Sequence, residues 1–283
     1  MLKLNRKVSE KLDALKGWLT SGEGSIVAFS GGIDSSLVLY LANMVQGNGK
    51  AIAVISRSES LKSRDFELAL SFSKQYKITL EVITTSELDD IRYNENPINR
   101  CFFCKDHLYN DLQTIVDKYP GYRVLNGTNV DDLGDYRPGL EAAMNYNVFS
   151  PLAECNITKS EIRQIADFYN LPNRNKPASP CLSSRVPYNH KITRKKLMEI
   201  EKAENFLNDS GFADVRVRHY GDFGRIEVKP EDLKRLMLIK DNVIEKIKEI
   251  GFNRIEIDEE GLVSGKMNRV ISVQKAETKI NSN

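Results

Sequence analysis

The sequence predicts an α/β protein: a doubly wound, mostly parallel sheet followed by a smaller α+β domain. Three observations support this fold class. Short apolar runs alternate with segments of helical periodicity in the first part of the chain. A loop with two glycines connects the first apolar run to a helix. After a proline-rich stretch, alternating strands and charged helices begin again.

The elements of the first domain follow one another at short intervals. Residues 8–20 carry apolar side chains at helical spacing, and Ser21-Gly22-Glu23-Gly24 ends that helix. The apolar run 25–29 leads through Ser30-Gly31-Gly32 into a helix over 35–45. The alternation then continues with strands at 51–55, 79–83 and 122–125 and helices at 63–76, 104–118 and 158–169. The last of these helices opens on the capping-box pattern Thr158-Lys159-Ser160-Glu161.

Residues 171–188 hold four of the nine prolines, so this segment is expected to be irregular and to end the first domain. The second domain is expected to contain helices at 193–210 and 231–250 and strands at 214–220, 225–229 and 254–257. The predicted organisation is therefore an α/β domain over 1–188, an α+β domain over 189–275 and a flexible tail over 276–283.

Composition limits the classes of function. The net charge of the 283-residue chain is only +2, which favours neither a nucleic-acid nor a membrane surface. The start carries no apolar leader and no later run is long enough to span a bilayer, so we expect a cytoplasmic protein with no membrane partner. Its four cysteines are then expected to be thiols, metal ligands or catalysts rather than disulfides.

The loop Ser30-Gly31-Gly32-Ile33-Asp34-Ser35-Ser36 lies between a predicted strand and a predicted helix. Two glycines let the backbone approach a ligand, and the free amides of a helix N-terminus attract an anion. A Walker A motif and a dinucleotide fingerprint are both absent from the sequence. The alternative is an ordinary turn in which Asp34 caps the helix.

This loop resembles the PP-loop of the ATP pyrophosphatases, whose fold is adenine nucleotide α-hydrolase-like and which cleave ATP to an adenylate and pyrophosphate. The resemblance implies ATP and Mg²⁺ as cofactors, with Asp34 near the magnesium. It also implies that Ala28 and Ser56, at two strand ends, flank the adenosine. The residues expected to hold pyrophosphate are Ser30, Gly31, Gly32, Asp34, Ser35 and Ser36.

Further segments, taken together and in this order, resemble the LarE family. They are Asn96–Lys105, Leu125–Asp132, Asp135–Gly139, Ser179–Arg185 and Val215–His219. The family adenylates a carboxylate of a pyridinium biscarboxylic acid mononucleotide and replaces oxygen with sulfur on the way to a nickel-pincer cofactor. The resemblance implies a homo-oligomer supplied by sulfide or a sulfur-donor system, and it assigns Gly127, Thr128 and Asp131 to the nucleotide site.

Three cysteines carry the expected sulfur chemistry. The resemblance implies that Cys101, Cys104 and Cys181 hold a [4Fe-4S] cluster, because one branch of the family adds a Cys-x-x-Cys to its single cysteine. It also implies catalytic roles for Ser184 and Arg185. Three alternatives stay open: a zinc site completed by Cys155 or His107, a sacrificial Cys181 without a cluster, and a buried inert Cys181. Cys155 is otherwise interpreted as an ordinary buried cysteine.

Arg216 and Arg218 lie two residues apart on a predicted strand, so their side chains share a face. Paired guanidinium groups suit the phosphate of a mononucleotide. The alternative is a solvated strand face with salt bridges. Glu204 and Glu227 are expected to orient substrate or metal, or to be surface carboxylates.

Other functions remain to be distinguished from sulfur transfer to a mononucleotide. A tRNA-thiolating enzyme would share the loop and a cysteine-bound cluster, but it needs an RNA-binding surface that the net charge does not favour. An ammonia-using synthetase of the NAD synthetase type would make the cysteines incidental. A nucleotide sensor without enzymatic activity would bind ATP and release no pyrophosphate.

Overall fold

The computed structural model describes residues 3–47, 49–134, 138–263 and 266. The motif residues 135–137 and the expected tail at 276–283 lie outside these ranges. The chain divides into two compact units. Unit 1 comprises Met1–Glu87 and Asn99–Ser179, and unit 2 comprises Leu88–Ile98 and Pro180–Asn283.

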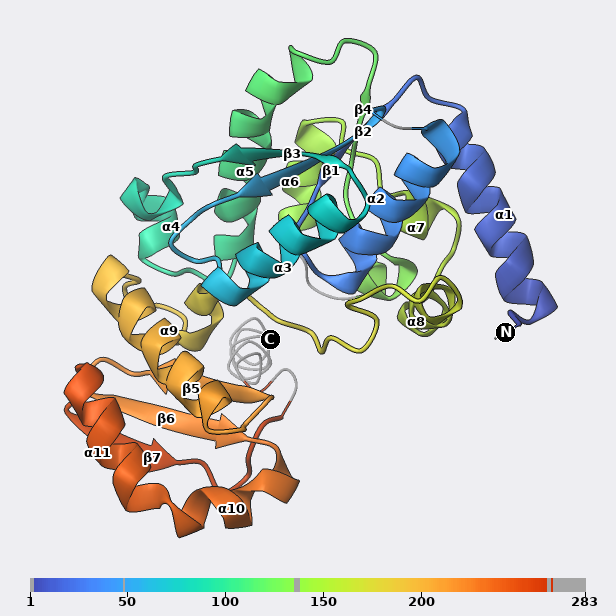
Figure 1. The fold of residues 1–283 in the computed structure, drawn as a ribbon. Coiled ribbons are helices and arrows are strands. Elements are labelled where there is room, and N and C mark those ends of the chain that lie inside the picture. Colours follow the sequence, from blue (N-terminus) through green and yellow to red (C-terminus); the bar gives the residue numbers. More distant parts are fainter. Residues whose placement is uncertain (1–2, 48, 135–137, 264–265, 267–283) are drawn as a thin grey trace, which may run out of the picture. The chain divides into compact units, whose positions relative to one another are not determined.

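Unit 1 is built on a sheet of four parallel strands in the order β3-β2-β1-β4, shown in Figure 1. The strands are β1 (Ser25–Ala28), β2 (Ala51–Ser56), β3 (Thr79–Ile83) and β4 (Arg123–Leu125). The helices are α1 (Arg6–Thr20), α2 (Ile33–Gln46), α3 (Ser63–Gln75), α5 (Arg100–Val116), α6 (Gly139–Asn145), α7 (Pro151–Glu154) and α8 (Lys159–Phe168). The predicted α/β class is confirmed.

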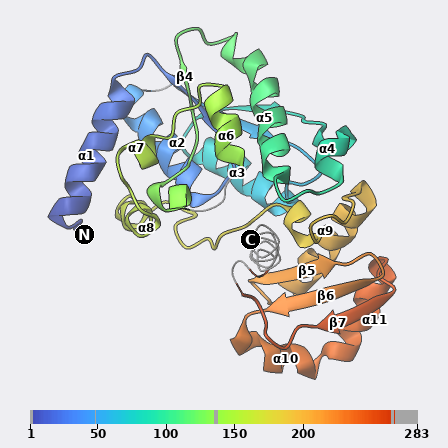
Figure 2. The same ribbon diagram turned by 180° about the vertical axis from the view of Figure 1, so that it is seen from behind.

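Helices cover both faces of the sheet because alternate strand residues point to opposite sides. On β2, Ile52 and Val54 pack with side chains of α5. The intervening Ala53 and Ile55 pack in a second core with α1, α2, α3 and α8. Figures 1 and 2 show α5 on one side of the sheet and α1, α2 and α8 on the other.

The strand order places a topological switch point between β1 and β4. From β1 the chain moves through β2 to β3 on one side, and then returns to pair β4 with the other side of β1. In parallel α/β sheets, ligands bind outside the carboxyl ends of the strands at such a point. The loop after β1 and the loop after β4 therefore define the expected site.

Unit 2 contains a three-stranded sheet in the order β5-β6-β7. Strands β5 (Val215–His219) and β6 (Phe223–Val228) are antiparallel, and β7 (Arg254–Ile257) runs parallel to β6. Its helices are α4 (Ile91–Asn94), α9 (Arg194–Asp209), α10 (Leu233–Leu238) and α11 (Lys240–Ile250). Val215 and Val217 are buried on one face of β5, while Arg216 and Arg218 alternate with them.

The division of the chain differs from the expected boundary after residue 188. It falls between Ser179 and Pro180, and unit 2 also takes residues 88–98 from the middle of the α/β region. The buried Asn96 explains this, because its amide donates to the carbonyls of Val186 at 3.1 Å and Pro187 at 2.6 Å. A sequence pattern cannot show such long-range hydrogen bonds.

Two predicted helices begin or divide at other residues than expected. Helix α5 begins at Arg100, four residues before the predicted start, so Cys101 and Cys104 both lie in its first turns. The single helix predicted over 231–250 is α10 and α11, separated at Ile239, whose φ of −115° departs from helical values. Buried Leu236, Val243 and Ile247 keep helical spacing across the break, which therefore leaves no trace in the pattern.

Candidate functional site

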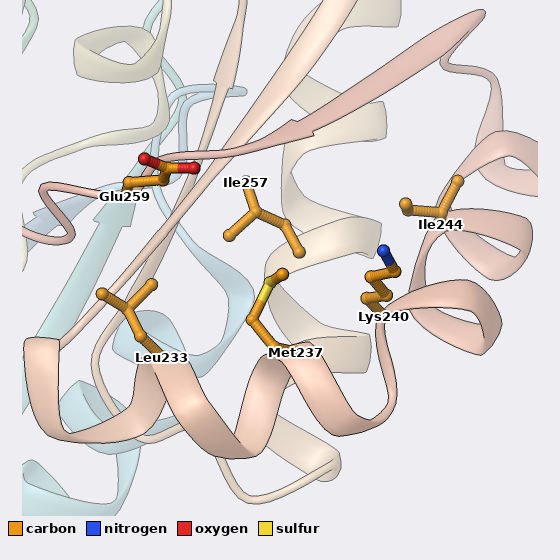
Figure 3. A pocket seen from close by; sticks show the side chains of 6 residues that line it. All are labelled: Leu233, Met237, Lys240, Ile244, Ile257 and Glu259. Atoms are coloured by element: carbon orange, nitrogen blue, oxygen red, sulfur yellow. The ribbon is translucent and has the colours of Figure 1, made fainter.

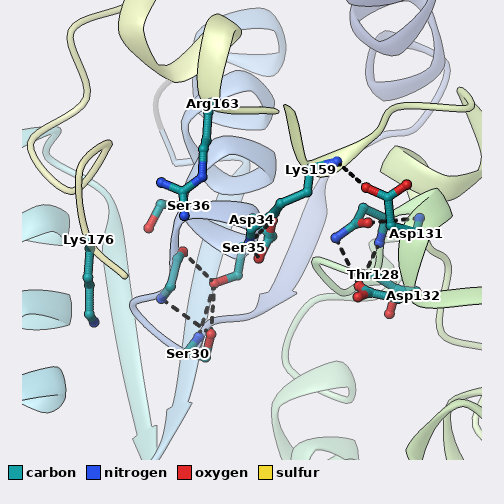
Figure 4. A network of polar contacts seen from close by, with 12 residues as sticks. Ser30, Asp34, Ser35, Ser36, Thr128, Asp131, Asp132, Lys159, Arg163 and Lys176 are labelled. Atoms are coloured by element: carbon teal, nitrogen blue, oxygen red, sulfur yellow. Dashed lines mark hydrogen bonds and ion pairs between the residues drawn. The ribbon is translucent and has the colours of Figure 1, made fainter. Parts of the chain in front are cut away.

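The loop after β1 is shaped by its glycines and by hydrogen bonds between its own serines. Gly31 has a φ of +68°, which a residue with a side chain rarely adopts. Ser30 Oγ and Ser35 Oγ lie 3.1 Å apart, and the Gly32 amide donates to Ser30 Oγ at 3.3 Å (Figure 4). Gly32 caps α2 without a side-chain hydrogen bond, so the helix presents its N-terminal amides to a ligand.

The loop after β4 packs tightly against the start of α2. A Cβ added to Gly127 would lie 2.6 Å from the backbone nitrogen of Ser35, so no side chain fits there. The neighbouring Thr128 amide donates to Asn126 Oδ1 at 2.9 Å. The structure thus brings Gly127 beside the phosphate loop, and the assignment of Gly127 and Thr128 to the nucleotide site stays a prediction.

Asp34, the expected magnesium ligand, is paired with a lysine. Lys159 Nζ, from the first turn of α8, donates to Asp34 Oδ1 at 2.6 Å. The backbone amide of the same lysine donates to Asp131 Oδ2 at 2.7 Å. Oxygen donors of this kind suit a hard divalent cation, and Asp34 already holds a positive group (Figure 4).

Sequence reasoning missed the cations that surround the loop. Besides Lys159, Lys176 donates to the carbonyl of Gly31 at 3.1 Å and pairs with Asp65 at 3.0 Å. Figure 4 shows Arg163 extending from α8 toward Ser36. The confirmed capping box at Thr158 and Glu161 was the available signal, because it fixes the start of α8 and hence where Lys159 lies.

Two further expected site residues occupy the carboxyl ends of β1 and β2. Ala28 is half-buried against the core on the α5 side. The Oγ atoms of Ser56 and Thr85 lie 2.7 Å apart. Ser36, in contrast, is fully buried, and its hydroxyl accepts a hydrogen bond from Asn173 at 2.7 Å.

Cys101 and Cys104 form no disulfide and lie one helical turn apart at the start of α5, the first exposed and the second half-buried. Residues at this spacing share a helix face, so the two sulfurs can bind one group. Cys155 packs against the core of unit 1, and burial raises the pKa of its thiol. Among the residues described, no three His, Cys, Asp or Glu side chains form a metal site.

Cys181 belongs to unit 2, where it precedes a short 3₁₀ turn, Leu182–Arg185. Buried Arg185 donates to the carbonyls of Pro180 at 2.8 Å and Cys181 at 3.3 Å. Its guanidinium is held in turn by Glu204 through hydrogen bonds of 2.7 and 3.1 Å. Arg185 therefore fixes the backbone of Cys181, while the convergence of Cys181 with Cys101 and Cys104 stays a prediction.

The two arginines of β5 have different surroundings. Arg218 is buried, donates to Glu227 at 2.9 Å and donates to the Ser184 carbonyl at 2.6 Å. The half-buried side chain of Arg216 makes no hydrogen bond or ion pair with any described residue. Burial, and then the positive charges of Arg185 and Arg218, lower its pKa from the usual value. Such a cation would be stabilised by a bound anion.

Unit 2 also contains an apolar cavity of about 360 Å³, shown in Figure 3. It lies between β7, α10 and α11 and is lined by Leu233, Met237, Lys240, Ile244, Ile257 and Glu259. None of these residues belongs to the expected site, and β7 is the sheet edge opposite β5. Within the described part of the chain, no helix has the length and apolar character needed to cross a membrane.

A parallel sheet with a glycine-serine phosphate loop between β1 and α2 defines the PP-loop class of ATP-using enzymes. Comparison with known proteins supports this class. The NAD synthase family matches residues 9–99. The solved structure of NMN synthetase from Francisella tularensis has the same fold, with a TM-score of 0.50 and 18% identity over 62% of this chain and 76% of that one.

Full-length relatives identify the family. The chain is 33% identical to the pyridinium-3,5-bisthiocarboxylic acid mononucleotide synthase of Lactiplantibacillus plantarum, over 87% of this chain and 89% of that protein. It is 38% identical to an uncharacterized protein of Synechocystis sp., over 94% of this chain and 99% of that one. The chain therefore belongs to the LarE family, that of the pyridinium-3,5-bisthiocarboxylic acid mononucleotide synthases.

Proposed function

We propose that this protein is an ATP-dependent sulfur transferase that converts a carboxylate of a pyridinium mononucleotide into a thiocarboxylate during nickel-pincer cofactor synthesis. The observation that carries the proposal is the 33% identity to the Lactiplantibacillus plantarum synthase over 87% of the chain. An alignment of that length includes residues of both the phosphate-loop unit and the unit with Cys181 and Arg216.

The first step is adenylation of the carboxylate. A carboxylate oxygen attacks the α-phosphorus of ATP, and pyrophosphate leaves onto the amides at the start of α2. Lys159, which pairs with Asp34, and Lys176, which donates to the Gly31 carbonyl, neutralise the departing charge. Asp34 would hold the Mg²⁺ ion, which supplies charge stabilisation at the phosphate oxygens.

The mononucleotide needs an anchor away from its reacting carboxylate. Arg216 suits the substrate phosphate because its half-buried side chain forms no hydrogen bond or ion pair with a described residue, whereas the nearby Glu227 and Glu204 are bound to Arg218 and Arg185. Arg218 is already bound to Glu227, so its main contribution is to hold the strand and the Ser184 backbone. Glu204 similarly holds Arg185.

Sulfur then replaces AMP on the activated carbon. Cys101, Cys104 and Cys181 would hold a [4Fe-4S] cluster, which supplies an open iron site for sulfide when bound. The chain's own part is to place Cys101 and Cys104 on one helix face and to fix the Cys181 backbone through Arg185. We further propose that sulfide or a sulfur-donor system restores the transferred sulfur after each turnover. We also propose that the enzyme is a homo-oligomer.

Anaerobic purification with iron, sulfide and zinc analysis tests this function, combined with turnover of ATP, Mg²⁺ and the pyridinium biscarboxylate mononucleotide. We expect pyrophosphate, AMP and a thiocarboxylate product, together with iron and sulfide that are lost in Cys101→Ser but retained in Cys155→Ser. If Cys181 instead loses the elements of H₂S during turnover, the sulfur comes from a sacrificial cysteine and not from a cluster. AMP release that depends on ammonia and not on sulfide would contradict the proposal.

A further inference from the structure

A buried carboxylate lies among hydroxyl groups next to the carboxyl ends of β2 and β3. Glu87 is 1% exposed, and no Lys or Arg side chain in the described ranges pairs with it. Its Oε2 accepts a hydrogen bond from Thr85 at 2.6 Å, and its Oε1 accepts one from Ser60 at 3.1 Å. Two more hydroxyls extend this cluster: Ser56 lies 2.7 Å from Thr85, and Ser58 lies 2.9 Å from Ser60.

The direction of each hydrogen bond follows from the single proton of a hydroxyl. A carboxylate only accepts, so Thr85 must donate its proton to Glu87. Thr85 then has no proton left for Ser56, and Ser56 must donate to Thr85. The half-buried Ser56 oxygen is consequently left with free lone pairs and no free proton. Glu87 thereby turns Ser56 into an obligate hydrogen-bond acceptor.

Ser56 lies at the carboxyl edge of the sheet, the edge at which parallel α/β sheets bind ligands. It is the last residue of β2, and in the register of the sheet Val54, two residues earlier, lies beside Ala28, the last residue of β1 and two residues before the phosphate loop. A nucleotide with its phosphates on that loop extends across the carboxyl ends of the neighbouring strands. Both β2 and β3 lie on the same side of β1.

We propose that Glu87 is a positioning residue for nucleotide selection: through Thr85 it holds Ser56 as an acceptor, which selects a base with an exocyclic amino group. Adenine has this group, whereas hypoxanthine has a carbonyl at the same position. A carbonyl facing the Ser56 lone pairs would remain without a hydrogen bond in a half-buried site. This inference rests on the proposed function only in taking ATP as the nucleotide.

The test is the ratio of the affinities for ATP and inosine triphosphate, measured by calorimetry with Mg²⁺ and without a second substrate. The wild-type protein is expected to bind ATP about 10-fold more tightly, or more. Thr85→Val removes the hydroxyl to which Ser56 donates, and Glu87→Met removes the carboxylate that fixes the direction of that hydrogen bond. Ser56 can then donate to a base as well as accept, so the ratio should fall toward one. Ser60→Ala removes the hydrogen bond to Glu87 Oε1 and the link to Ser58, but it leaves Glu87, Thr85 and Ser56 connected and should keep the wild-type ratio.

The ratio distinguishes selection from stability, because a merely structural change would weaken the binding of both nucleotides equally. Circular dichroism melting curves would show that each variant is folded. Equal wild-type affinities for the two nucleotides, or an unchanged ratio in folded Thr85→Val, would overturn the inference. Selective ATP binding without sulfur transfer would support the inference and contradict the proposed function, while absence of ATP binding would overturn both.

Discussion

The phosphate loop of unit 1 and the strand β5 of unit 2 are both proposed to bind a phosphate, but they are built differently. In the loop, the binding groups are backbone amides, and the nearby charges are paired, Asp34 with Lys159 and Asp65 with Lys176. On β5, the proposed binding group is the side chain of Arg216, which forms no ion pair with a described residue.

This difference predicts which kind of substitution should impair each region. The loop depends on close backbone packing and on the N-terminal end of α2, so steric changes should damage it most. The strand depends on buried charges, since Arg185–Glu204 and Arg218–Glu227 are ion pairs with side chains less than 5% exposed. Removing one partner of such a pair leaves a buried charge without compensation.

The largest expected effect is therefore that of Arg218→Ala on unit 2. The change leaves Glu227 buried and unpaired, and we expect a loss of about 3–5 kcal/mol in the free energy of unfolding. Urea unfolding followed by circular dichroism measures the loss.

Adding Glu227→Gln to Arg218→Ala should recover much of the lost free energy of unfolding. The fluorescence of Trp18, the single tryptophan, reports unit 1 and should change little. An unfolding midpoint like that of the wild type would show that the pair contributes no stability.

Arg216→Ala should behave in the opposite way, although it lies only two residues from Arg218. Burial and neighbouring cations disfavour the Arg216 charge, so its removal should leave the unfolding free energy unchanged or slightly higher. Affinity for the mononucleotide should fall about 100-fold, equivalent to about 2.7 kcal/mol. Calorimetric titration tests this, with Arg225→Ala on β6 as a control. Unchanged affinity would remove Arg216 from the substrate site.

Gly127→Ala should damage the loop through sterics alone. The added Cβ would lie 2.6 Å from the Ser35 nitrogen, so either α2 or the loop after β4 must shift. We expect a loss of about 1–3 kcal/mol in stability and weaker ATP binding, measured by Trp18 fluorescence and by calorimetry. Gly134→Ala, where nothing lies within 4 Å of the added Cβ, is the matched control. Equal behaviour of the two variants would show that this contact is not important.

Local sequence patterns predicted the framework of the loop well. The run from Ser25 to Ser36 gave a strand, a turn and a helix, and the structure has β1 and α2 in those places. The strands at 79–83 and 254–257 were also predicted at their observed bounds. These features depend on neighbours in sequence, namely on periodicity, glycine conformations and helix capping, which a single segment contains.

The pairing of charges could not be predicted in this way. Lys159 and Asp34 are 125 positions apart, and Arg185 and Glu204 are 19 apart, so only the tertiary fold brings each pair together. Arg216 and Arg218 were expected to act as equal partners because they share a strand face. Their difference arises from Glu227, which lies opposite Arg216 in register but bonds to Arg218.

Lys159→Met tests the electrostatic contribution to the ATP affinity of the loop, which we expect to be smaller than the steric one. The variant keeps the backbone amide that bonds to Asp131 and removes only the ammonium held by Asp34. We expect ATP affinity to fall about 10-fold, because one cation near the phosphates is lost, while the fold is retained. Lys50→Met, an exposed lysine in the same unit, controls for net charge. Equal ATP affinities in the two variants would show that Lys159 serves only the fold.

The smallest expected effect is a pH dependence of unit 2 that comes from His219. His219 bonds to Glu199 at 2.9 Å, and its Nδ1 accepts a hydrogen bond from the Gly221 amide. Burial lowers the pKa of His219, and Lys196 lowers it further, while Glu199 opposes this shift without reversing it. The unfolded chain therefore binds a proton at higher pH than the folded one. The contribution of His219 to the free energy of unfolding is fully present above the unfolded pKa of about 6.5, and it is lost as the pH falls toward the folded pKa. Urea unfolding between neutral and acidic pH should show this slope flattened in His219→Gln and kept in His190→Gln, the exposed control. A slope that persists in His219→Gln would assign the pH dependence to the carboxylates instead.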